Sequence, residues 1–459
     1  MQQFRIEKDS IGEKQVPINA YYGVQSLRAK ENFCISGKKV NPELVKATVE
    51  IKKAAAITNA KAGVLSKQRA DAMCWACDQI LQGGYEESFI VDAIQGGAGT
   101  SLNMNVNEVV ANLAIEKLNG QKGDYTIVHP NDHVNCGQST NDVYPSAGKI
   151  AIIRLLTKAI CSLEKFYNAI MDKSEQFKDV IKMGRTEMQD AVPVSFGQTF
   201  KAYACSIQRD IKRFKQAVQV MSSLNMGGTA IGTCINADKY YVENIVEELS
   251  KVCGLQFSQA DDLVDSTQNL DVFVVVSSMV KACAVNLSKM ANDLRLMSSG
   301  PRTGFGEINL PAKQNGSSIM PGKVNPVIPE VINQIAFNAI GNDATVTMAC
   351  EAGQLELNAF EPIIFYCLFE SIETITNGVE VFRKDCIEGI TVNVQKCVEE
   401  LESSVGIVTA LCPYVGYAKA SELAKKAIKE GKKIRQVIIE EKILDENLLN
   451  QVLDPSKMI

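Results

Sequence analysis

The chain has 459 residues, of which 46% are hydrophobic and 22% are charged, the balance of a globular protein with a large core. Lys and Arg together number 48 and Asp and Glu number 53, so the formal net charge is -5. A chain with this charge has no strongly basic face, which argues against nucleic acid as its main partner.

The N-terminal sequence, M-Q-Q-F-R-I-E-K-D-S, lacks the basic and then apolar segments of a signal peptide. The most apolar run, from Val272 to Val276, is far too short to span a bilayer. We therefore expect a cytoplasmic protein with no membrane partner. In that compartment the 14 scattered cysteines are expected to be reduced thiols that pack as small hydrophobic groups.

Two features are candidates for a metal site, and both are explained better in other ways. The C-x-x-C of Cys74 and Cys77 lies in a helical pattern, and no second pair completes a zinc site. A buried helix face explains this motif better than redox or metal chemistry. The chain has only two histidines, His129 and His133, which excludes a histidine-rich metal site. We expect no bound metal.

Residues 1–138 mix short turns with amphipathic segments and form the first predicted domain. Two or three short strands are expected near the start. Apolar residues at helical spacing predict helices over 44–61, 68–82 and 103–117. The Gly-rich loop Q-G-G-A-G-T at 95–100 precedes the last of these helices.

Residues 139–393 form the second predicted domain, in which apolar residues recur at helical spacing with few breakers. The helical stretches cover 145–177, 194–223 and 265–299, and two more begin after Pro329 and Pro362. Helices of about 25 to 35 residues far exceed the globular mean of about 11–12. Their succession predicts a bundle of long helices. The β-branched run at 273–280 lies inside a helical stretch, which favours a buried helix over a strand.

Residues 394–459 are predicted to form a small helical domain. Amphipathic segments cover 418–430 and 433–441, with Gly431 between them as a helix stop. The long helices of the central domain are hydrophobic over most of their circumference, and one bundle cannot cover its own outer surface. We therefore expect a homo-oligomer that buries the bundles against each other.

The loop G-S-S-I-M-P-G-K-V-N-P at 316–326 suggests a phosphate cradle at first sight. A Walker loop has four residues between its glycines and a Ser or Thr after its lysine. Here five residues separate Gly316 from Gly322, and Val324 follows Lys323. No strand pattern precedes the loop. The sequence therefore argues against an ATP site.

Four polar loops interrupt the helices, at 96–101, 129–142, 184–190 and 316–325. Their Ser, Thr and Asn residues have an ordinary explanation as helix caps. Four such loops together are better explained by a site that holds carboxylates, because hydroxyls, amides, helix N-termini and one lysine suit a small dianion. The candidate residues are Thr100, Ser101, Ser139, Thr140, Asn141, Thr186, Ser317, Ser318, Lys323 and Asn325.

The 316–326 loop closely resembles the signature of the aspartase/fumarase superfamily, whose lyases release fumarate from succinyl-containing substrates. H-P-N-D-H-V-N at 129–135, G-Q-S-T-N-D at 137–142 and G-R-T-E-M-Q-D-A at 184–191 match the other loops of the family in order and spacing. The resemblance covers essentially the whole chain. It implies a mainly α, three-domain subunit and a homotetramer with a central helical core. It also implies active sites assembled from three subunits.

Further segments resemble the aspartate ammonia-lyases of this superfamily rather than its fumarases. These segments are G-A-G-T-S-L-N-M-N at 97–105, S-T-N-D-V-Y-P at 139–145, V-I-P-E at 327–330 and the stretch 340–355. The implied reaction converts L-aspartate to fumarate and ammonia without a cofactor, with divalent-cation activation as an option in the family. The alternatives are a fumarase that hydrates fumarate to malate, and a structural lens crystallin. A crystallin is expected to lack the active-loop residues that this chain retains.

The resemblance also implies roles for the loop residues. Removal of the C3 proton produces an enediolate, or aci-carboxylate, which the enzyme must bind better than the ground state. Ser317 matches the general base. Thr100, Ser139, Thr140 and Ser318 match ligands of the carboxylate that takes up the charge, and Ser101 lies beside them. Lys323 and Asn325 match ligands of the other carboxylate, and Asn141 and Thr186 match contacts near the amino group.

Glu187 departs from the family, in which this position is often a histidine on which fumarases rely. Expulsion of hydroxide benefits from proton delivery, whereas an ammonium group leaves as neutral ammonia and needs no acid. The substitution therefore favours an ammonia-lyase. Glu187 is placed either to pair with the substrate ammonium or to repel its carboxylates. For His129 and His133 we favour a role in shaping their turn or in binding a second anion over an acid/base pair.

Overall fold

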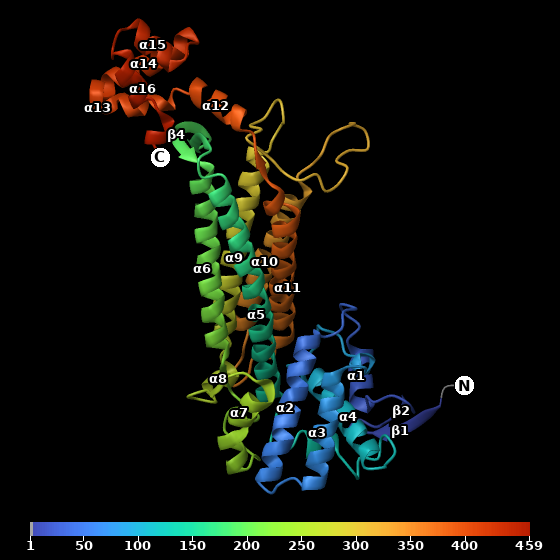
Figure 1. The fold of residues 1–459 in the computed structure, drawn as a ribbon. Coiled ribbons are helices and arrows are strands. Elements are labelled where there is room, and N and C mark those ends of the chain that lie inside the picture. The colour runs from blue at the N-terminus through green and yellow to red at the C-terminus, as the bar shows by residue number, and fades with distance from the viewer. Residues whose placement is uncertain (1–2) are drawn as a thin grey trace. The chain divides into compact units, whose positions relative to one another are not determined.

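The computed structural model describes residues 3–459, and the chain is mainly α-helical (Figure 1). Its contacts divide it into two compact units. The first comprises Met1–Ile160, Lys212–Ala282 and Phe337–Ile375, and the second comprises Cys161–Ile211, Cys283–Ala336 and Thr376–Ile459. The predicted domains 1–138, 139–393 and 394–459 remain a prediction.

The first unit begins with a small antiparallel hairpin, which confirms the short strands expected near the start. Strand β1 covers Phe4–Lys8 and β2 covers Glu13–Pro17, with Phe4 opposite Pro17. Helix α1 follows at Val24–Asn32. The buried Glu7 carboxylate accepts the Val24 backbone N–H at 2.9 Å, which ties the hairpin to the start of this helix.

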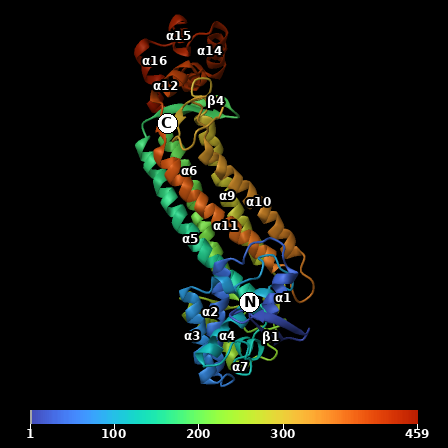
Figure 2. The ribbon, with the colours of Figure 1, turned by 90° about the vertical axis from the view of Figure 1, so that its right-hand side faces the viewer.

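Three further helices of the first unit lie side by side in both views (Figures 1 and 2). They are α2 (Pro42–Lys61), α3 (Lys67–Gln82) and α4 (Thr100–Lys117), and α7 (Lys239–Cys253) packs on α2. The side chains of Asn41 and Ser66 cap α2 and α3 by accepting backbone N–H groups. The structure confirms the three predicted helices, although α4 begins at Thr100, three residues earlier than predicted.

Five long helices contribute residues to both units, and they confirm the predicted succession. They are α5 (Thr140–Gln176), α6 (Phe196–Met221), α9 (Asp271–Met297), α10 (Val327–Glu351) and α11 (Glu361–Asp385). The β-branched run at 273–280 is helical, as predicted. The stretch 265–299 is not one helix, because extended backbone at Asn269 separates the short α8 (Asp265–Gln268) from α9.

Aromatic rings join the long helices within each unit. In the first unit the Phe365 ring on α11 lies 5.3 Å from Tyr144 on α5 and 5.2 Å from Phe273 on α9. In the second unit Phe166 on α5 lies 5.4 Å from Phe382 on α11. These contacts bury large apolar areas, which is the main favourable term in helix packing.

Helix α9 is, within residues 3–459, the one helix long and apolar enough to cross a membrane by length and composition alone. Its mean hydropathy is 1.5, with 39% of that window buried, so the shortness of the 272–276 run does not describe the whole helix. The polar residues of α9 contact neighbouring helices. Ser277 Oγ and Lys281 Nζ donate to Asp343 on α10 at 2.8 and 2.5 Å. Such contacts are those of a core helix in a bundle.

The second unit contains the hairpin of β3 (Ile181–Thr186) and β4 (Gln189–Ser195) and a set of short C-terminal helices. These helices are α12 (Val394–Ser403), α13 (Cys412–Val415), α14 (Tyr417–Glu430), α15 (Ile434–Glu440) and α16 (Glu446–Val452). Gly431 adopts a left-handed φ of 61° and ends α14, as predicted.

The remaining strands of the described chain form two short pairs. They are β5 (Ser223–Leu224) with β6 (Ser258–Gln259) in the first unit and β7 (Ile308–Asn309) with β8 (Thr391–Val392) in the second.

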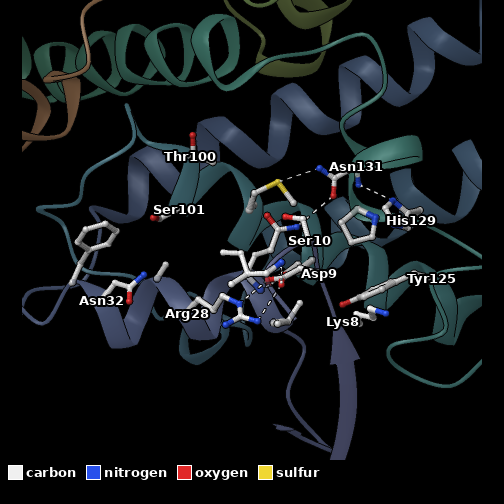
Figure 3. A pocket seen from close by; sticks show the side chains of 18 residues that line it. Lys8, Asp9, Ser10, Arg28, Asn32, Thr100, Ser101, Tyr125, His129 and Asn131 are labelled. Atoms are coloured by element: carbon white, nitrogen blue, oxygen red, sulfur yellow. Dashed lines mark hydrogen bonds and ion pairs between the residues drawn. The ribbon is translucent and has the colours of Figure 1, made fainter. Parts of the chain in front are cut away.

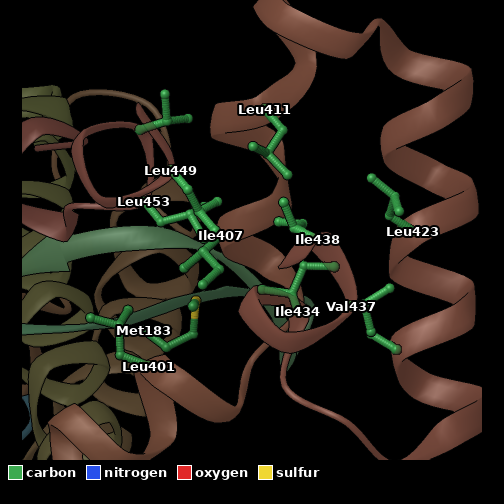
Figure 4. Packing of buried hydrophobic residues seen from close by; sticks show 12 residues of the cluster. Met183, Leu401, Ile407, Leu411, Leu423, Ile434, Val437, Ile438, Leu449 and Leu453 are labelled. Carbon is green, nitrogen blue, oxygen red and sulfur yellow. The ribbon is translucent and has the colours of Figure 1, made fainter. Parts of the chain in front are cut away.

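A hydrophobic cluster holds the C-terminal helices together (Figure 4). Leu411, Leu423, Ile438 and Leu449 are all buried in it. Met183 from β3 lies in the same cluster, next to Leu401 in the view. The hairpin is therefore anchored by its base in the C-terminal core, while its turn projects from that core.

The contact of α5 with α11 at Gly148 gives a test of the helix packing. A Cβ atom at Gly148 would lie 2.0 Å from the Phe365 ring, so Gly148→Ala is expected to lower the apparent melting temperature, at a cost of about 1–3 kcal/mol. Thermal unfolding measures the variant against wild type, and an unchanged melting temperature would contradict this packing.

Candidate active site

Thr100 and Ser101 occupy the first turn of α4, Thr100 exposed and Ser101 partly buried. Gly99 precedes them with a φ of 87°, and a Cβ atom there would lie 2.4 Å from the Tyr144 ring. Only glycine combines this backbone conformation with so close an approach. Gly99 therefore lets the N-terminus of α4 lie against the first turn of α5.

Ser139, Thr140 and Asn141 lie at the N-terminus of α5. Ser139 Oγ accepts the Asn141 backbone N–H at 3.2 Å, and Asn141 Nδ2 donates to the Ala230 carbonyl at 2.8 Å. Thr140 Oγ1 accepts from Asn103 Nδ2 on α4 at 3.3 Å. The five candidate residues of the first unit therefore gather where two helices begin, and helix N-termini favour bound anions.

Buried charges support this end of α5 from behind. The Asp142 carboxylate is fully buried and accepts backbone N–H groups of Ser139, Gly227 and Thr229 at 2.9, 3.1 and 3.2 Å. Burial raises the pKa of Asp142 to about 6, although these donors act in the opposite direction. Burial likewise lowers the pKa of Lys52 on α2, against the attraction of Asp142.

A cavity of about 520 Å3 in the first unit connects Thr100 and Ser101 with the 129–131 loop (Figure 3). Arg28, His129 and Asn131 also line it. Arg28 does not present a free charge, because its guanidinium pairs with Asp9 at 2.7 Å. The charge of Arg28 is therefore neutralised within the lining by Asp9.

The two histidines shape their own turn, as predicted. His129 Nδ1 accepts the backbone N–H groups of Asn131 and Asp132, both at 3.2 Å. His133 Nδ1 accepts the His129 backbone N–H at 2.8 Å. These bonds enclose the π-helical turn Pro130–Val134. Each ring thus has one nitrogen committed to the backbone, as expected of residues that organise a turn.

In the second unit, Ser317 lies in the loop before α10 and is partly buried. Its Oγ accepts the backbone N–H of Ile319 at 3.2 Å and of Met320 at 2.9 Å. Two N–H donors aimed at one oxygen stabilise negative charge on it. This geometry is that of a local serine turn, which leaves the Ser317 hydroxyl hydrogen free to point away from the two N–H groups.

The rest of this loop closes on itself and presents its functional groups to solvent. Asn325 Nδ2 donates to the Gly316 carbonyl at 3.0 Å, and a Cβ atom at Gly316 would lie 2.1 Å from the Lys323 carbonyl oxygen. Ser318 and Lys323 are exposed. The loop therefore brings Ser317, Ser318, Lys323 and Asn325 together on one short segment with a closed base.

Thr186 and Glu187 lie at the tip of the β3–β4 hairpin, and both are exposed. Thr186 pairs with Gln189, which leaves Glu187 and Met188 as a two-residue turn. Their φ values are 51° and 65°, the pattern of a type I′ turn. This hairpin was not predicted, since its strands are short and its turn lacks the usual Asn-Gly signal.

Arg185, in the same motif, has a structural role. Its guanidinium donates to Glu307 at 2.7 Å and to Glu400 at 3.0 Å, and it stacks on the Phe305 ring at 4.3 Å. Lys182 also pairs with the fully buried Glu307, at 3.2 Å. An arginine that bridges two carboxylates and stacks on a ring in this way fixes geometry. It holds the hairpin beside α12 within the second unit.

The candidate residues thus fall into two sets by unit, and the structure brings only the first set together, while the second lies on two separate segments, the β3–β4 hairpin and the loop before α10. The first set is Thr100, Ser101, Ser139, Thr140 and Asn141, and the second is Thr186, Glu187, Ser317, Ser318, Lys323 and Asn325. Sequence reasoning missed the supporting residues Lys52, Asn103 and Asp142. The one signal available was the density of Asn residues on α4, which is unusual for a buried helix.

Comparison with known proteins places the chain in a family. A family model described as Lyase matches residues 12–341, and one described as Fumarase C C-terminus matches residues 407–459. An aspartate ammonia-lyase from Bacillus sp is 50% identical over 454 residues, which is 99% of this chain and 97% of that protein. One from Helicobacter pylori (strain J99 / ATCC 700824) is 49% identical, over 99% of this chain and 98% of that protein.

Solved structures agree with these matches. A crystal structure of fumarate lyase:delta crystallin from Brucella melitensis, bound to cobalt, has a TM-score of 0.97, 47% identity and 99% coverage of both chains. Recombinant class II fumarase from Schistosoma mansoni has a TM-score of 0.96, 34% identity and 99% coverage of both chains. The chain therefore belongs to the aspartase/fumarase superfamily of lyases.

Proposed function

We propose that the protein is an aspartate ammonia-lyase, which converts L-aspartate reversibly to fumarate and ammonia. Full-length relatives of 46% to 50% identity that carry this name support the assignment. The single observation that carries the chemistry is the pair of backbone N–H groups donated to Ser317 Oγ. A carbon–nitrogen lyase of this kind needs a strong base beside its substrate, and this serine fits that role.

The proposed reaction begins with proton transfer from C3 of aspartate to the Ser317 alkoxide. The electron pair of the broken C–H bond moves into the adjacent carboxylate, which becomes an aci-carboxylate with a second negative charge. This charge returns to form the C2–C3 double bond as the C2–N bond breaks, and ammonia leaves. An alkoxide base requires local stabilisation at neutral pH, which the two N–H donors and the Lys323 ammonium would provide.

The hydroxyl groups at the helix N-termini would bind the charge-accumulating carboxylate. These groups belong to Thr100, Ser139, Thr140 and Ser318. Preorganised donors at this position stabilise the transition state more than the substrate, which is the requirement for raising kcat. Lys323 and Asn325 would bind the other carboxylate, while Asn141 and Thr186 would contact the amino group. These steps use side chains alone, so the proposal needs no cofactor.

We also infer a homotetramer, in which the two residue sets meet across subunits. In support, apolar side chains remain exposed along the long helices: Val285 is 49% exposed, Phe337 is 64% exposed and Met348 is 70% exposed. Large exposed apolar surfaces on long helices commonly mark subunit interfaces. The Ser317 loop of one subunit would then close over Thr100 and Thr140 of another, in the cytoplasm.

The purified protein is expected to form fumarate from L-aspartate without added metal or cofactor, as measured by ultraviolet absorbance. L-malate tested in parallel should yield no fumarate, because departure of hydroxide needs an acid where this chain has Glu187. Turnover of malate instead of aspartate would overturn the ammonia-lyase assignment in favour of a fumarase.

Ser317→Ala is expected to lower kcat for L-aspartate by about 10² to 10⁴-fold, since it removes the base and little substrate affinity. The matched control is Ser299→Ala, because Ser299 Oγ also accepts a backbone N–H, from Phe305 at 3.0 Å, outside the candidate site. Steady-state kinetics measure both. A kcat for Ser317→Ala within threefold of the wild-type value would exclude Ser317 as the base.

Glu187→Gln is expected to keep turnover of L-aspartate within about tenfold, a barrier change of roughly 1.4 kcal/mol, because ammonia leaves without an acid. Asp190→Asn removes a carboxylate from the same exposed hairpin and serves as the control. The kcat/KM of both variants is measured by fumarate formation. A loss of several orders of magnitude in Glu187→Gln alone would instead make Glu187 catalytic.

A further inference from the structure

Lys52 is a fully buried lysine in the middle of α2, and its ammonium faces amides. Its Nζ donates to Asn103 Oδ1 at 2.6 Å, to Asn135 Oδ1 at 2.9 Å and to Gln138 Oε1 at 2.9 Å. The three donors of an ammonium group thus match three amide oxygens. A buried charge is expensive, so a lysine retained here requires a reason beyond packing.

A lysine ammonium donates and never accepts, so it fixes which way each amide points. Asn103 must present Oδ1 to Lys52, and its Nδ2 therefore faces Asn135 Oδ1 at 3.1 Å and Thr140 Oγ1 at 3.3 Å. Gln138 must present Oε1, and its Nε2 therefore donates to the Val134 carbonyl at 3.0 Å. The donor and acceptor directions of all these hydrogen bonds therefore follow from the single Lys52 ammonium.

The network ends at the Thr140 hydroxyl. Since Thr140 Oγ1 accepts from Asn103, its own hydrogen points away from that amide. We propose that Lys52 is a positioning residue that, through Asn103, sets the Thr140 hydroxyl as a donor toward the substrate carboxylate. This inference rests on the proposed function, in which Thr140 binds the carboxylate that takes up charge.

Lys52 also secures the segment that leads into the site. Asn135 and Gln138 lie just before Ser139, and Asn135 Nδ2 donates to the Gln138 carbonyl at 3.1 Å. The ammonium therefore contacts both the helix that begins at Thr100 and the loop that ends at Ser139. Removal of the ammonium is expected to disturb the orientation of donors at both helix N-termini, which differs from a simple loss of packing.

The decisive variant is Asn103→Asp, which changes the polarity of the network but hardly its shape. The aspartate offers two acceptors, one for Lys52 and one for the Thr140 hydroxyl, which then donates inward. The substitution also removes the N–H that Asn103 donates to Asn135 Oδ1, so the melting temperature is expected to fall, and the kinetics are measured well below the unfolding transition. Loss of one preorganised donor is expected to lower kcat by about 10² to 10³-fold, with a smaller change in KM.

The same substitution in a Thr140→Val background separates this mechanism from simple charge repulsion. Without the hydroxyl, Asn103→Asp has no donor to redirect and is expected to lower kcat/KM by at most about threefold, because effects transmitted through one group are not additive. An equal loss in both backgrounds would overturn the inference. The inference would also be overturned if the wild-type enzyme is active and the single variant Asn103→Asp keeps the full wild-type kcat.

A second pair of variants tests the role of the ammonium itself. Lys52→Met removes the donor at nearly constant shape, and Lys53→Met is the matched control, since the Lys53 ammonium pairs with Asp78 at 2.6 Å. The fold decrease in kcat should be at least about ten times larger for Lys52→Met than for Lys53→Met. Failure of wild type to turn over aspartate would instead refute the proposed function.

Thermal unfolding gives a readout that does not depend on turnover. Lys52→Met and Asn103→Leu should each lower the melting temperature, and the double variant should lower it no further than the larger single effect, because both remove one shared interaction. Strictly additive shifts would show that Lys52 does not act through Asn103. Where Lys52→Met fails to fold, the kinetics of Asn103→Asp still decide the question.

Discussion

The close contact of α5 with α11 is the constraint on which the first unit depends. Gly148 leaves no room for a side chain against Phe365, and the Phe365 ring also meets Tyr144 and Phe273. Because interiors are packed at crystal-like density, a helix held this way cannot rotate or slide without a large cost. Tyr144 in turn fills the space that Gly99 leaves at the start of α4. The positions of both helix N-termini, and of the hydroxyls on them, follow from this packing.

Apolar packing determines where the helices lie, but it does not determine which way hydroxyl groups point. Hydrogen bonds from buried polar groups orient these hydroxyls. Asp142 collects three backbone N–H groups from two separate segments, and Lys52 collects three amide oxygens. Each charge is costly to bury and is tolerable only because its bonding capacity is used. In each case the buried charge is matched by donors or acceptors from more than one segment.

Much of the fold followed from the sequence because long amphipathic helices carry a strong periodic signal. The extents of α2 and α3 and the start of α11 were predicted within a few residues, and the helical nature of 273–280 was correctly preferred over a strand. The β3–β4 hairpin gave no such signal, since its order comes from Met183 in the C-terminal core and from Arg185 between two carboxylates. Motifs identified the candidate site residues. They did not identify Lys52, because only tertiary structure distinguishes this buried lysine from its partly buried neighbour Lys53.

The Ser317 loop differs from the helix N-termini in which parts of the chain supply its hydrogen bonds. The donors to Ser317 Oγ come from the next residues of the same loop, and Asn325 bonds back to Gly316 at its base. Both hydrogen-bond donors to Ser317 Oγ therefore lie within about ten consecutive residues of the loop. A segment of this kind can move as one piece toward a site built by other parts of the protein without losing these two bonds.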